Sequence, residues 1–231
     1  MTTSLPLHYV GRDSSNPNGE ARPLLVLLHG FASYEQHLFR HAGLFDPQWP
    51  IIAPRAPLRI GPGAYRWFYF TRTATGPIIE TEEQHVSLRL LVVFLEAIRD
   101  QRKPRQIFLL GHSQGGSMAL SVLMTRPDLI DGVVNVNGRI VPNNAASPSA
   151  DSRLRGFPVF TRHGEDNPIV PLPMAHRTRD LLMQHGVSID YRDVPNIGHG
   201  FTPEILADSS QWLKVRAETR TAQPVNDAPL R

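Results

Sequence analysis

The sequence predicts an α/β fold with a mostly parallel central sheet and helices on both faces of that sheet. Two observations lead to this prediction. Short apolar runs alternate with longer amphipathic segments along the whole chain, and the clearest run is continuous, as expected for a strand covered on both faces. A length of 231 residues suits one domain of this class, and no repeat or long linker divides the chain.

The first half of the chain supplies the first elements. Residues 24–28 form an uninterrupted apolar run that ends at His29-Gly30, and residues 51–53 form a shorter run before Pro54, so both are predicted strands. Residues 82–100 carry apolar side chains at helical spacing, which predicts a helix.

The second half continues the alternation. An apolar run at 106–110 predicts a strand, and the stretch 117–125, rich in Ala, Leu and Met, predicts a helix that ends before Pro127. Gly186 is expected to end another helix, and alternating residues predict the last strand. The further strands are predicted at 132–136, 158–161 and 188–194, and the further helices at 174–184 and 203–215.

Composition excludes several classes of function. The 24 Lys and Arg residues exceed the 21 Asp and Glu residues by three and form no basic cluster, which argues against nucleic-acid binding. The absence of cysteine excludes disulfides, thiolate zinc sites and a cysteine nucleophile, and no spacing indicates a metal or cofactor site. No signal peptide is recognisable and no apolar run approaches the roughly 20 residues of a membrane span, so a soluble, cytoplasmic protein is expected.

The predicted organisation is an N-terminal segment (1–22) with a possible first strand, one domain (23–216) and a flexible tail (217–231).

The most informative motif is Gly111-His112-Ser113-Gln114-Gly115, a G-x-S-x-G sequence between a predicted strand and a predicted helix. An abrupt strand-to-helix turn needs small residues on either side of the serine and projects its hydroxyl above the sheet edge. Ser113 is therefore the candidate nucleophile, with a helix-capping serine in a glycine-rich turn as the alternative. For the oxyanion hole we expect the backbone N–H groups of Gln114 and of Phe31, which follows the first predicted strand.

A serine nucleophile needs a base and a group that orients the base. His199 lies in a glycine-containing loop between the last strand and the last helix, and this place fits the chain order serine, acid, histidine of elbow enzymes. The acid should follow the strand at 158–161, where Glu165, Asp166 and Asn167 compete.

These motifs together resemble the phospholipase/carboxylesterase family, which includes acyl-protein thioesterases and small bacterial carboxylesterases. The resemblance covers roughly residues 23–213. It implies an α/β-hydrolase fold without a large cap domain, and a cofactor-free serine hydrolase that acts on short or medium acyl esters or thioesters, often as a homodimer. The matching segments are 27–31, 55–57, 67–68, 113–120, 163–164, 170–171 and 198–200.

One position departs from the family pattern. The family motif places its acid at position 167, where this sequence has Asn167, with Asp166 directly before it. Asp166 is slightly favoured as the orienting acid, Asn167 is the alternative with weakened turnover, and Asp193 is a less favoured substitute. Three interpretations follow: an active esterase, a weakly active or ligand-binding hydrolase-fold protein, and a thioesterase, lysophospholipase or perhydrolase that uses the same residues.

The substrate pocket is less well defined by the sequence. Five aromatic residues lie within positions 65–70, and we expect Trp67, Phe68 and Tyr69 to contribute to the wall of an acyl pocket. Packing of these rings onto the domain is an equally weighted alternative. Arg66 and Arg72 are candidates for recognising an anionic leaving group, or are solvated surface residues.

Overall fold

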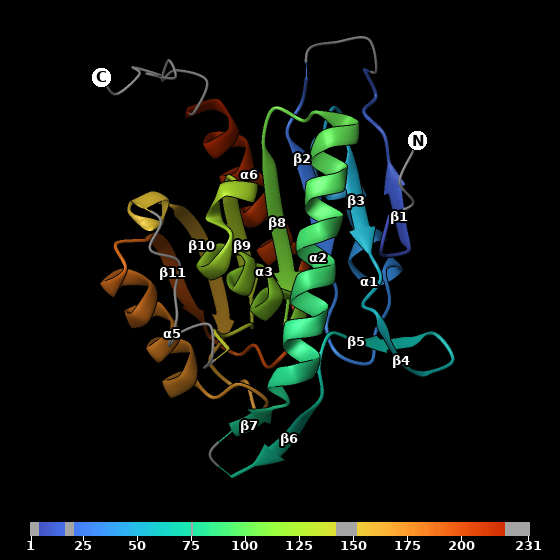
Figure 1. The fold of residues 1–231 in the computed structure, drawn as a ribbon. Coiled ribbons are helices and arrows are strands. Elements are labelled where there is room, and N and C mark those ends of the chain that lie inside the picture. The colour runs from blue at the N-terminus through green and yellow to red at the C-terminus, as the bar shows by residue number, and fades with distance from the viewer. Residues whose placement is uncertain (1–4, 17–20, 75, 142–151, 220–231) are drawn as a thin grey trace, which may run out of the picture.

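The computed structural model describes residues 5–16, 21–74, 76–141 and 152–219, and these residues build a central sheet between two helical layers (Figure 1). Within the described residues the sheet has seven strands in the order β1-β3-β2-β8-β9-β10-β11. β1 pairs antiparallel with β3, and the other pairings are parallel. The predicted α/β-hydrolase architecture is confirmed. The strands are β1 (Tyr9–Arg12), β2 (Leu24–Leu28), β3 (Ile51–Pro54), β8 (Ile107–His112), β9 (Gly132–Val136), β10 (Pro158–Gly164) and β11 (Ser188–Val194).

Two hydrophobic cores lie on opposite faces of the sheet. In β2, the side chains of Leu24, Val26 and Leu28 belong to the core under α2, α3 and α5, whereas Leu25 and Leu27 belong to the core under α1 and α6. Every residue of β2 is buried, which explains its uninterrupted apolar sequence. The helices are α1 (Gln36–Phe39), α2 (Thr81–Arg102), α3 (Gln114–Thr125), α5 (Leu172–Gln184) and α6 (Pro203–Thr219), with single 3₁₀ turns at Ala42–Leu44, Pro127–Leu129 and Ser152–Leu154.

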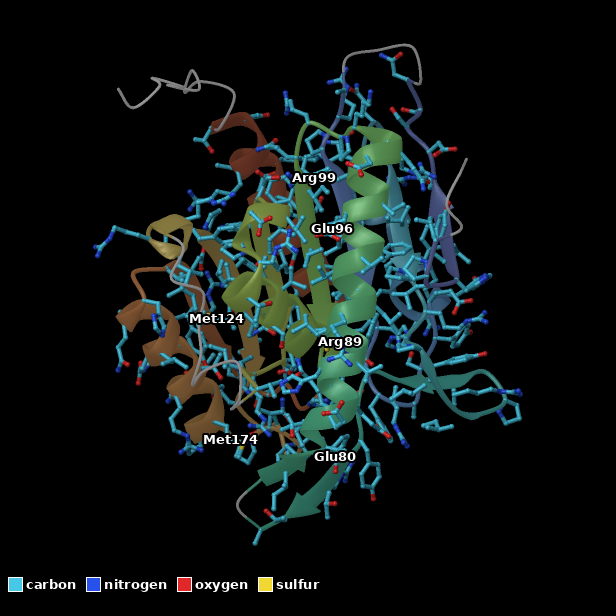
Figure 2. All side chains as sticks on the ribbon, in the orientation of Figure 1. Glu80, Arg89, Glu96, Arg99, Met124 and Met174 are labelled. Atoms are coloured by element: carbon cyan, nitrogen blue, oxygen red, sulfur yellow. The ribbon has the colours of Figure 1, made fainter. Side chains whose placement is uncertain are left out.

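Polar side chains of α2, among them Glu96 and Arg99 (Figure 2), also attach this helix to the turn after α3. Glu96 forms an ion pair with Arg126 at 2.7 Å, and Arg99 donates a hydrogen bond to the carbonyl of Leu129 at 2.7 Å. Arg89, on the same helix, is exposed. α2 is thereby attached to the rest of the domain by polar contacts as well as by its apolar side.

Two hairpins between β3 and α2 were not predicted. They are β4 (Leu58–Gly61) with β5 (Ala64–Arg66), and β6 (Phe70–Thr73) with β7 (Gly76–Ile79). Both lie near the carboxyl ends of the central parallel strands (Figure 1). Their strands are short and largely exposed, so they lack the apolar runs that identify the central strands.

The ends of the chain differ in part from expectation. β1 lies in the segment 1–22, where a first strand was expected. α6 continues through residues 217–219, where the sequence predicts a tail, and residues 220–231 lie outside the described residues. Of the helices that the structure describes, none combines the length and apolar character needed to cross a bilayer.

Candidate active site

Ser113 occupies a strained turn between β8 and α3. Its backbone has φ 56° and ψ −118°, a conformation that a residue with a Cβ rarely adopts, and its N–H donates to the carbonyl of Val136 at 2.8 Å. The strain is tolerated because α3 starts at the next residue and lies tightly against the sheet. This geometry exposes the hydroxyl at the carboxyl edge of the sheet, as the G-x-S-x-G motif predicts.

The glycines of the motif permit this close approach. A Cβ added at Gly115 would lie 1.9 Å from the carbonyl oxygen of Leu28, and one added at Gly111 would lie 2.2 Å from the carbonyl oxygen of Gly115. No side chain fits at either position without moving backbone. The two glycines therefore place the first turn of α3 directly against β2 and β8.

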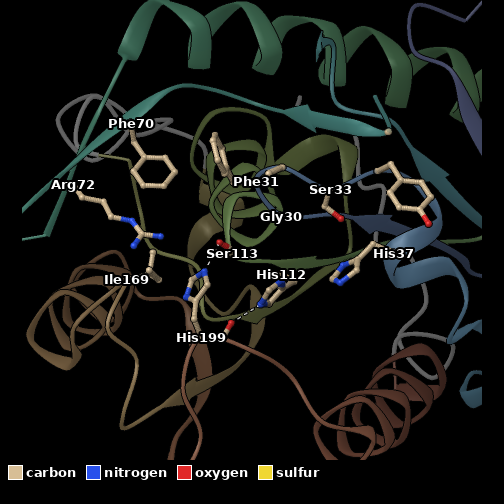
Figure 3. Close-up of a pocket in the computed structure, with 13 residues that line it drawn as sticks. Gly30, Phe31, Ser33, His37, Phe70, Arg72, His112, Ser113, Ile169 and His199 are labelled. Carbon is tan, nitrogen blue, oxygen red and sulfur yellow. Dashed lines mark hydrogen bonds between the residues drawn. The ribbon is translucent and has the colours of Figure 1, made fainter. Parts of the chain in front are cut away.

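The loop after β11 brings His199 to Ser113 (Figure 3). The hydroxyl of Ser113 lies 2.6 Å from Nε2 of His199. On the other side of the loop, Nε2 of His112 lies 2.7 Å from the carbonyl oxygen of His199, so this ring nitrogen carries a proton and donates it. His112 thus holds the backbone of the loop in place, a contact with His199 that no local sequence pattern indicates.

The second ring nitrogen of His199 faces Asn167. Nδ1 lies 3.0 Å from Oδ1 of Asn167, whereas Asp166 is exposed and its backbone N–H donates to the carbonyl of Ile197. The geometry corrects the slight preference for Asp166, because successive residues of this turn point in different directions. Asp193 is also placed elsewhere, since its carboxylate binds His176 at 2.8 Å and accepts a hydrogen bond from the hydroxyl of Tyr191.

The orientation of the Asn167 amide is determined by its neighbours. Its Oδ1 accepts hydrogen bonds from the backbone N–H groups of Ile169 and Val170, both at 3.0 Å, and its Nδ2 donates to Oδ1 of Asn137 at 3.0 Å. Asn137 is oriented in turn by the backbone. Its Oδ1 accepts from the N–H of Gly164 at 2.9 Å, and its Nδ2 donates to the carbonyl of Gly200 at 2.6 Å.

The imidazole of His199 is kept neutral by its surroundings. Burial, followed by the charges that His112, His163 and Arg72 carry when protonated, lowers the pKa of His199 to about 3. Burial also lowers the pKa of His112 to about 4. A carboxylate at position 167 would favour the imidazolium and so raise the pKa of His199, whereas the amide that is present carries no charge and does not.

The two residues expected to form the oxyanion hole, Gln114 and Phe31, belong to segments next to Ser113. Gln114 is the first residue of α3, so its N–H has no acceptor within the helix, and its side chain is held by the N–H of Trp67 at 3.0 Å and the carbonyl of Phe68 at 2.6 Å. Phe31 follows Gly30, at which an added Cβ would lie 3.3 Å from Cβ of Ser113. Both segments therefore border the serine.

Ser113 lines both a cleft and a smaller recess. The cleft has a volume of about 450 Å³, and the recess has a volume of about 30 Å³. Ser113, Phe70 and Ile169 line both spaces, so the cleft and the recess adjoin at these three residues. Apart from these three, the cleft is lined by Gly30, Phe31, Ala32, Ser33, Tyr34, His37, Gly63, Arg72, His112 and His199, and the recess is lined by Phe68, Pro77, Ile79, Gln114, Ser117, Arg139 and Val170.

The predicted aromatic wall is realised only in part. Phe68 lines the recess, but Trp67 is fully buried, with its indole N–H donating to the carbonyl of His29 at 2.9 Å. Tyr69 lines neither space, and its side chain is 47% exposed. Packing onto the domain is therefore the better description of Trp67, and Phe70 takes the place at the cleft.

Three polar residues of the site were missed or left undecided by the sequence reasoning. Asn137 and Arg139 follow β9, where the carboxyl end of a parallel strand is itself a signal for site residues. Arg72 lines the cleft, whereas Arg66 is occupied by an ion pair with Glu83 at 2.7 Å. Both arginines were candidates from the sequence, but no sequence feature distinguishes the arginine at the cleft from the arginine in the ion pair.

Comparisons with known proteins identify the family of this chain. The model of the phospholipase/carboxylesterase family matches residues 14–216. A probable carboxylesterase (SOBER1-like) of Arabidopsis thaliana is 24% identical over 90% of this chain and 84% of its own length, and acyl-protein thioesterase 1 of Gibberella zeae is 24% identical over 80% and 84%. Among solved structures, a carboxylesterase of Mesorhizobium loti superposes with a TM-score of 0.77 at 23% identity, over 92% of this chain and 96% of its own.

The family match spans most of the chain, and the fold agrees with it. The chain therefore belongs to the phospholipase/carboxylesterase family and is a carboxylic ester hydrolase of the α/β-hydrolase fold.

Proposed function

We propose that this protein cleaves short or medium acyl esters or thioesters through an acyl-enzyme on Ser113, with His199 as the base, Asn167 as its orienting partner and no cofactor. The observation that carries the proposal is the contact of 2.6 Å between Oγ of Ser113 and Nε2 of His199 on a strained elbow. A serine hydroxyl is a poor nucleophile unless a positioned base removes its proton.

The reaction has two halves. Oγ of Ser113 attacks the carbonyl carbon of the substrate while its proton moves to Nε2 of His199, and the N–H groups of Phe31 and Gln114 stabilise the oxyanion. The imidazolium then gives the proton to the departing alcohol or thiol, which leaves an acyl-enzyme. In the second half, water transfers a proton to His199 and attacks the acyl carbon, so that the acid is released and Ser113 is regenerated.

Asn167 supports this reaction by selecting the tautomer of His199. Its Oδ1 is fixed by two backbone N–H groups and accepts the third hydrogen bond from Nδ1–H of His199. With the proton on Nδ1, the lone pair of Nε2 faces Ser113, which is the arrangement a general base needs. In a serine protease, replacing the acid by asparagine costs about 10⁴ in turnover because the wrong tautomer results; the fixed amide avoids that part of the loss.

The amide does not supply negative charge to the imidazolium. A base whose pKa lies near 3 removes the serine proton less readily than one whose pKa lies near the working pH. We therefore expect slower turnover than a carboxylate at position 167 would allow in a compatible site. The same feature supports the second candidate, a weakly active protein whose main property is ligand binding.

The cleft indicates a small substrate. Phe31 and Phe70 pack edge to face with ring centroids 5.1 Å apart at its border, and the volume of about 450 Å³ is within the range of small-molecule sites. Phe70 and Ile169 line both the cleft and the recess next to the nucleophile, and these apolar side chains suit an acyl chain of short or medium length. The cleft is also lined by Arg72, His37 and His112, so a leaving group bound in the cleft has polar neighbours.

The test is hydrolysis of a panel of ethyl and p-nitrophenyl esters, with Ser113→Ala as the matched control. We expect slow but measurable hydrolysis that the substitution reduces at least about 10³-fold, together with labelling of Ser113 by a fluorophosphonate. Equal rates for the two proteins would contradict the proposal. Ligand affinity without turnover would favour the second candidate, and a thioester, a lysophospholipid, or acetate with hydrogen peroxide in the same panel separates the narrower activities.

A further inference from the structure

A buried arginine without an acidic partner lies beside the nucleophile. Arg139 follows β9 and is 8% exposed. Its backbone N–H donates to Oγ of Ser117 at 3.1 Å, and its Nη2 donates to the carbonyl of Pro77 at 2.6 Å. Among the residues that the structure describes, no carboxylate forms an ion pair with its guanidinium, and the like charge of Arg177 acts on it.

Such an environment is costly for a cation. Burial, together with Arg177, lowers the pKa of Arg139, which means that the surroundings disfavour the charged form. A guanidinium has five N–H donors, and the Pro77 carbonyl accepts only one hydrogen bond from it. Buried charges in proteins are normally paired with an opposite charge. An anion bound next to Arg139 would supply the missing partner.

The recess beside Ser113 provides the place for that anion. Arg139 lines it together with Ser113 and Gln114, and the lining of both recess and cleft among the described residues contains no aspartate or glutamate. Arg72 adds a second positive charge at the cleft. A volume of about 30 Å³ leaves room for roughly two water-sized groups, so the group bound there is short.

The position of His199 indicates which part of the substrate enters the recess. His199 lines the cleft and does not line the recess. The leaving oxygen or sulfur must face Nε2 of His199, because it receives its proton from there. The alcohol or thiol therefore occupies the cleft, and the acyl part extends past Ser113 toward Arg139.

We propose that the recess binds a free carboxylate at the far end of the acyl chain, so that the preferred substrates are half-esters or half-thioesters of short dicarboxylic acids held by Arg139. The inference rests on the proposed function of Ser113 as the nucleophile. Arg139 acts here as a specificity-determining residue, since it contacts the substrate away from the reacting carbonyl.

The first test uses the unmodified protein and compares monoethyl succinate with ethyl succinamate, its neutral amide of nearly the same shape. We expect kcat/KM for the acidic ester to exceed that for the amide by about 10- to 100-fold, the range of a charge-assisted hydrogen bond. Monoethyl malonate and monoethyl glutarate report the chain length that reaches Arg139. A rate for the amide that equals or exceeds that of the acidic ester would overturn the proposal while leaving the esterase function intact.

Variants identify the residue responsible. Arg139→Gln keeps a donor for the Pro77 carbonyl and should abolish the preference, whereas Arg139→Lys should retain part of it. Arg177→Gln removes an exposed positive charge close to Arg139 and should keep the preference, since Arg177 lines neither space. If Arg177→Gln alone loses the preference for the acidic ester, the preference arises from the positive charge of the whole region and not from contact with Arg139.

A binding measurement makes the result independent of turnover. Calorimetry on the Ser113→Ala protein should show tighter binding of monoethyl succinate than of ethyl succinamate, and Arg139→Gln should equalise the two. If no ester is hydrolysed, this difference in affinity still supports the acidic site and the proposed catalytic function alone fails. Equal affinities in the Ser113→Ala protein would refute the site.

Discussion

The amide at position 167 is matched to the residue that faces it. Asn137 presents Oδ1 to position 167 because the N–H of Gly164 and the carbonyl of Gly200 fix both ends of its own amide. A fixed acceptor requires a donor opposite it, and Nδ2 of Asn167 is that donor. A carboxylate at 167 would place a second acceptor about as close to Asn137 as Nδ2 is now, at 3.0 Å. The asparagine therefore fits its surroundings and is not an isolated exchange of one residue.

This match predicts a coupled response to substitution. Asn167→Asp alone should raise kcat/KM by less than about 10-fold. The carboxylate would stabilise the imidazolium of His199, but its repulsion of Oδ1 of Asn137 would offset that gain. Adding Asn137→Ser supplies a hydroxyl that can donate to the carboxylate, and the gain from Asp at 167 should then reach about 100-fold. The measurement is a double-mutant cycle of kcat/KM on one neutral ester.

The pH dependence of kcat/KM distinguishes this coupling between positions 137 and 167 from a structural effect. Because the pKa of His199 is lowered to about 3, the imidazole is neutral above about pH 4, and the unsubstituted protein should keep its rate down to that pH. A carboxylate beside Nδ1 stabilises the imidazolium and raises this pKa. The acidic limb of the profile should then move upward by at least one pH unit in the double variant. An unchanged limb, or purely additive effects in the cycle, would contradict the match.

At the scale of elements, the strand-turn-helix unit around Ser113 is set by two glycines and one buried strand. The space between α3 and β2 is so narrow that a methyl group at Gly115 would meet the backbone of Leu28. Side-chain rearrangement cannot relieve a contact with backbone, so the helix itself would have to move. The position of the serine hydroxyl therefore depends directly on how α3 packs against the sheet.

We therefore expect Gly115→Ala to destabilise the fold by about 1–3 kcal/mol or more, as overpacked cores do, and to slow labelling of Ser113 by a fluorophosphonate. Gly43→Ala is the matched control, because no atom lies within 4 Å of its added Cβ and the residue is exposed. Its effect should stay within about 0.5 kcal/mol. Urea unfolding measures both changes, and equal stability of the two variants would refute the packing argument.

The elements differ in how far the sequence predicts them. The strand at 24–28 and the elbow at 111–115 were predicted because burial on both faces and a tight turn each impose a distinct residue pattern. The hairpins β4-β5 and β6-β7 leave no such pattern, since their strands are only three or four residues long and have no fully buried residue in β4, β5 or β6. Whether Asp166 or Asn167 meets His199 depends on backbone N–H groups two and three residues beyond Asn167, which local sequence does not reveal.

At the scale of the whole molecule, several neutral histidines gather at the carboxyl edge of the sheet. His29 follows β2, His112 ends β8 and His199 lies in the loop after β11. His29 is 1% exposed, with Nδ1–H directed to the carbonyl of Gly30 at 2.8 Å and Nε2 accepting the N–H of Ala56 at 3.0 Å. A proton on Nε2 would remove that acceptor. The fold therefore depends on a histidine that must stay uncharged, and the proposed mechanism requires the same of His199.

This dependence predicts loss of stability in acid. Burial lowers the pKa of His29 to about 4, below the value of 6.5 that it has when exposed, so the unfolded chain binds the proton more readily. The contribution of His29 is fully present above pH 6.5 and should be lost as the pH falls toward 4, by about 3 kcal/mol in total. His29→Gln keeps an acceptor for Ala56 and a donor for Gly30, yet cannot be protonated. Its free energy of unfolding should therefore fall less steeply between pH 6.5 and 4 than that of the unsubstituted protein. Identical slopes for the His29→Gln variant and the unsubstituted protein in urea unfolding would show that the buried ring does not govern acid stability.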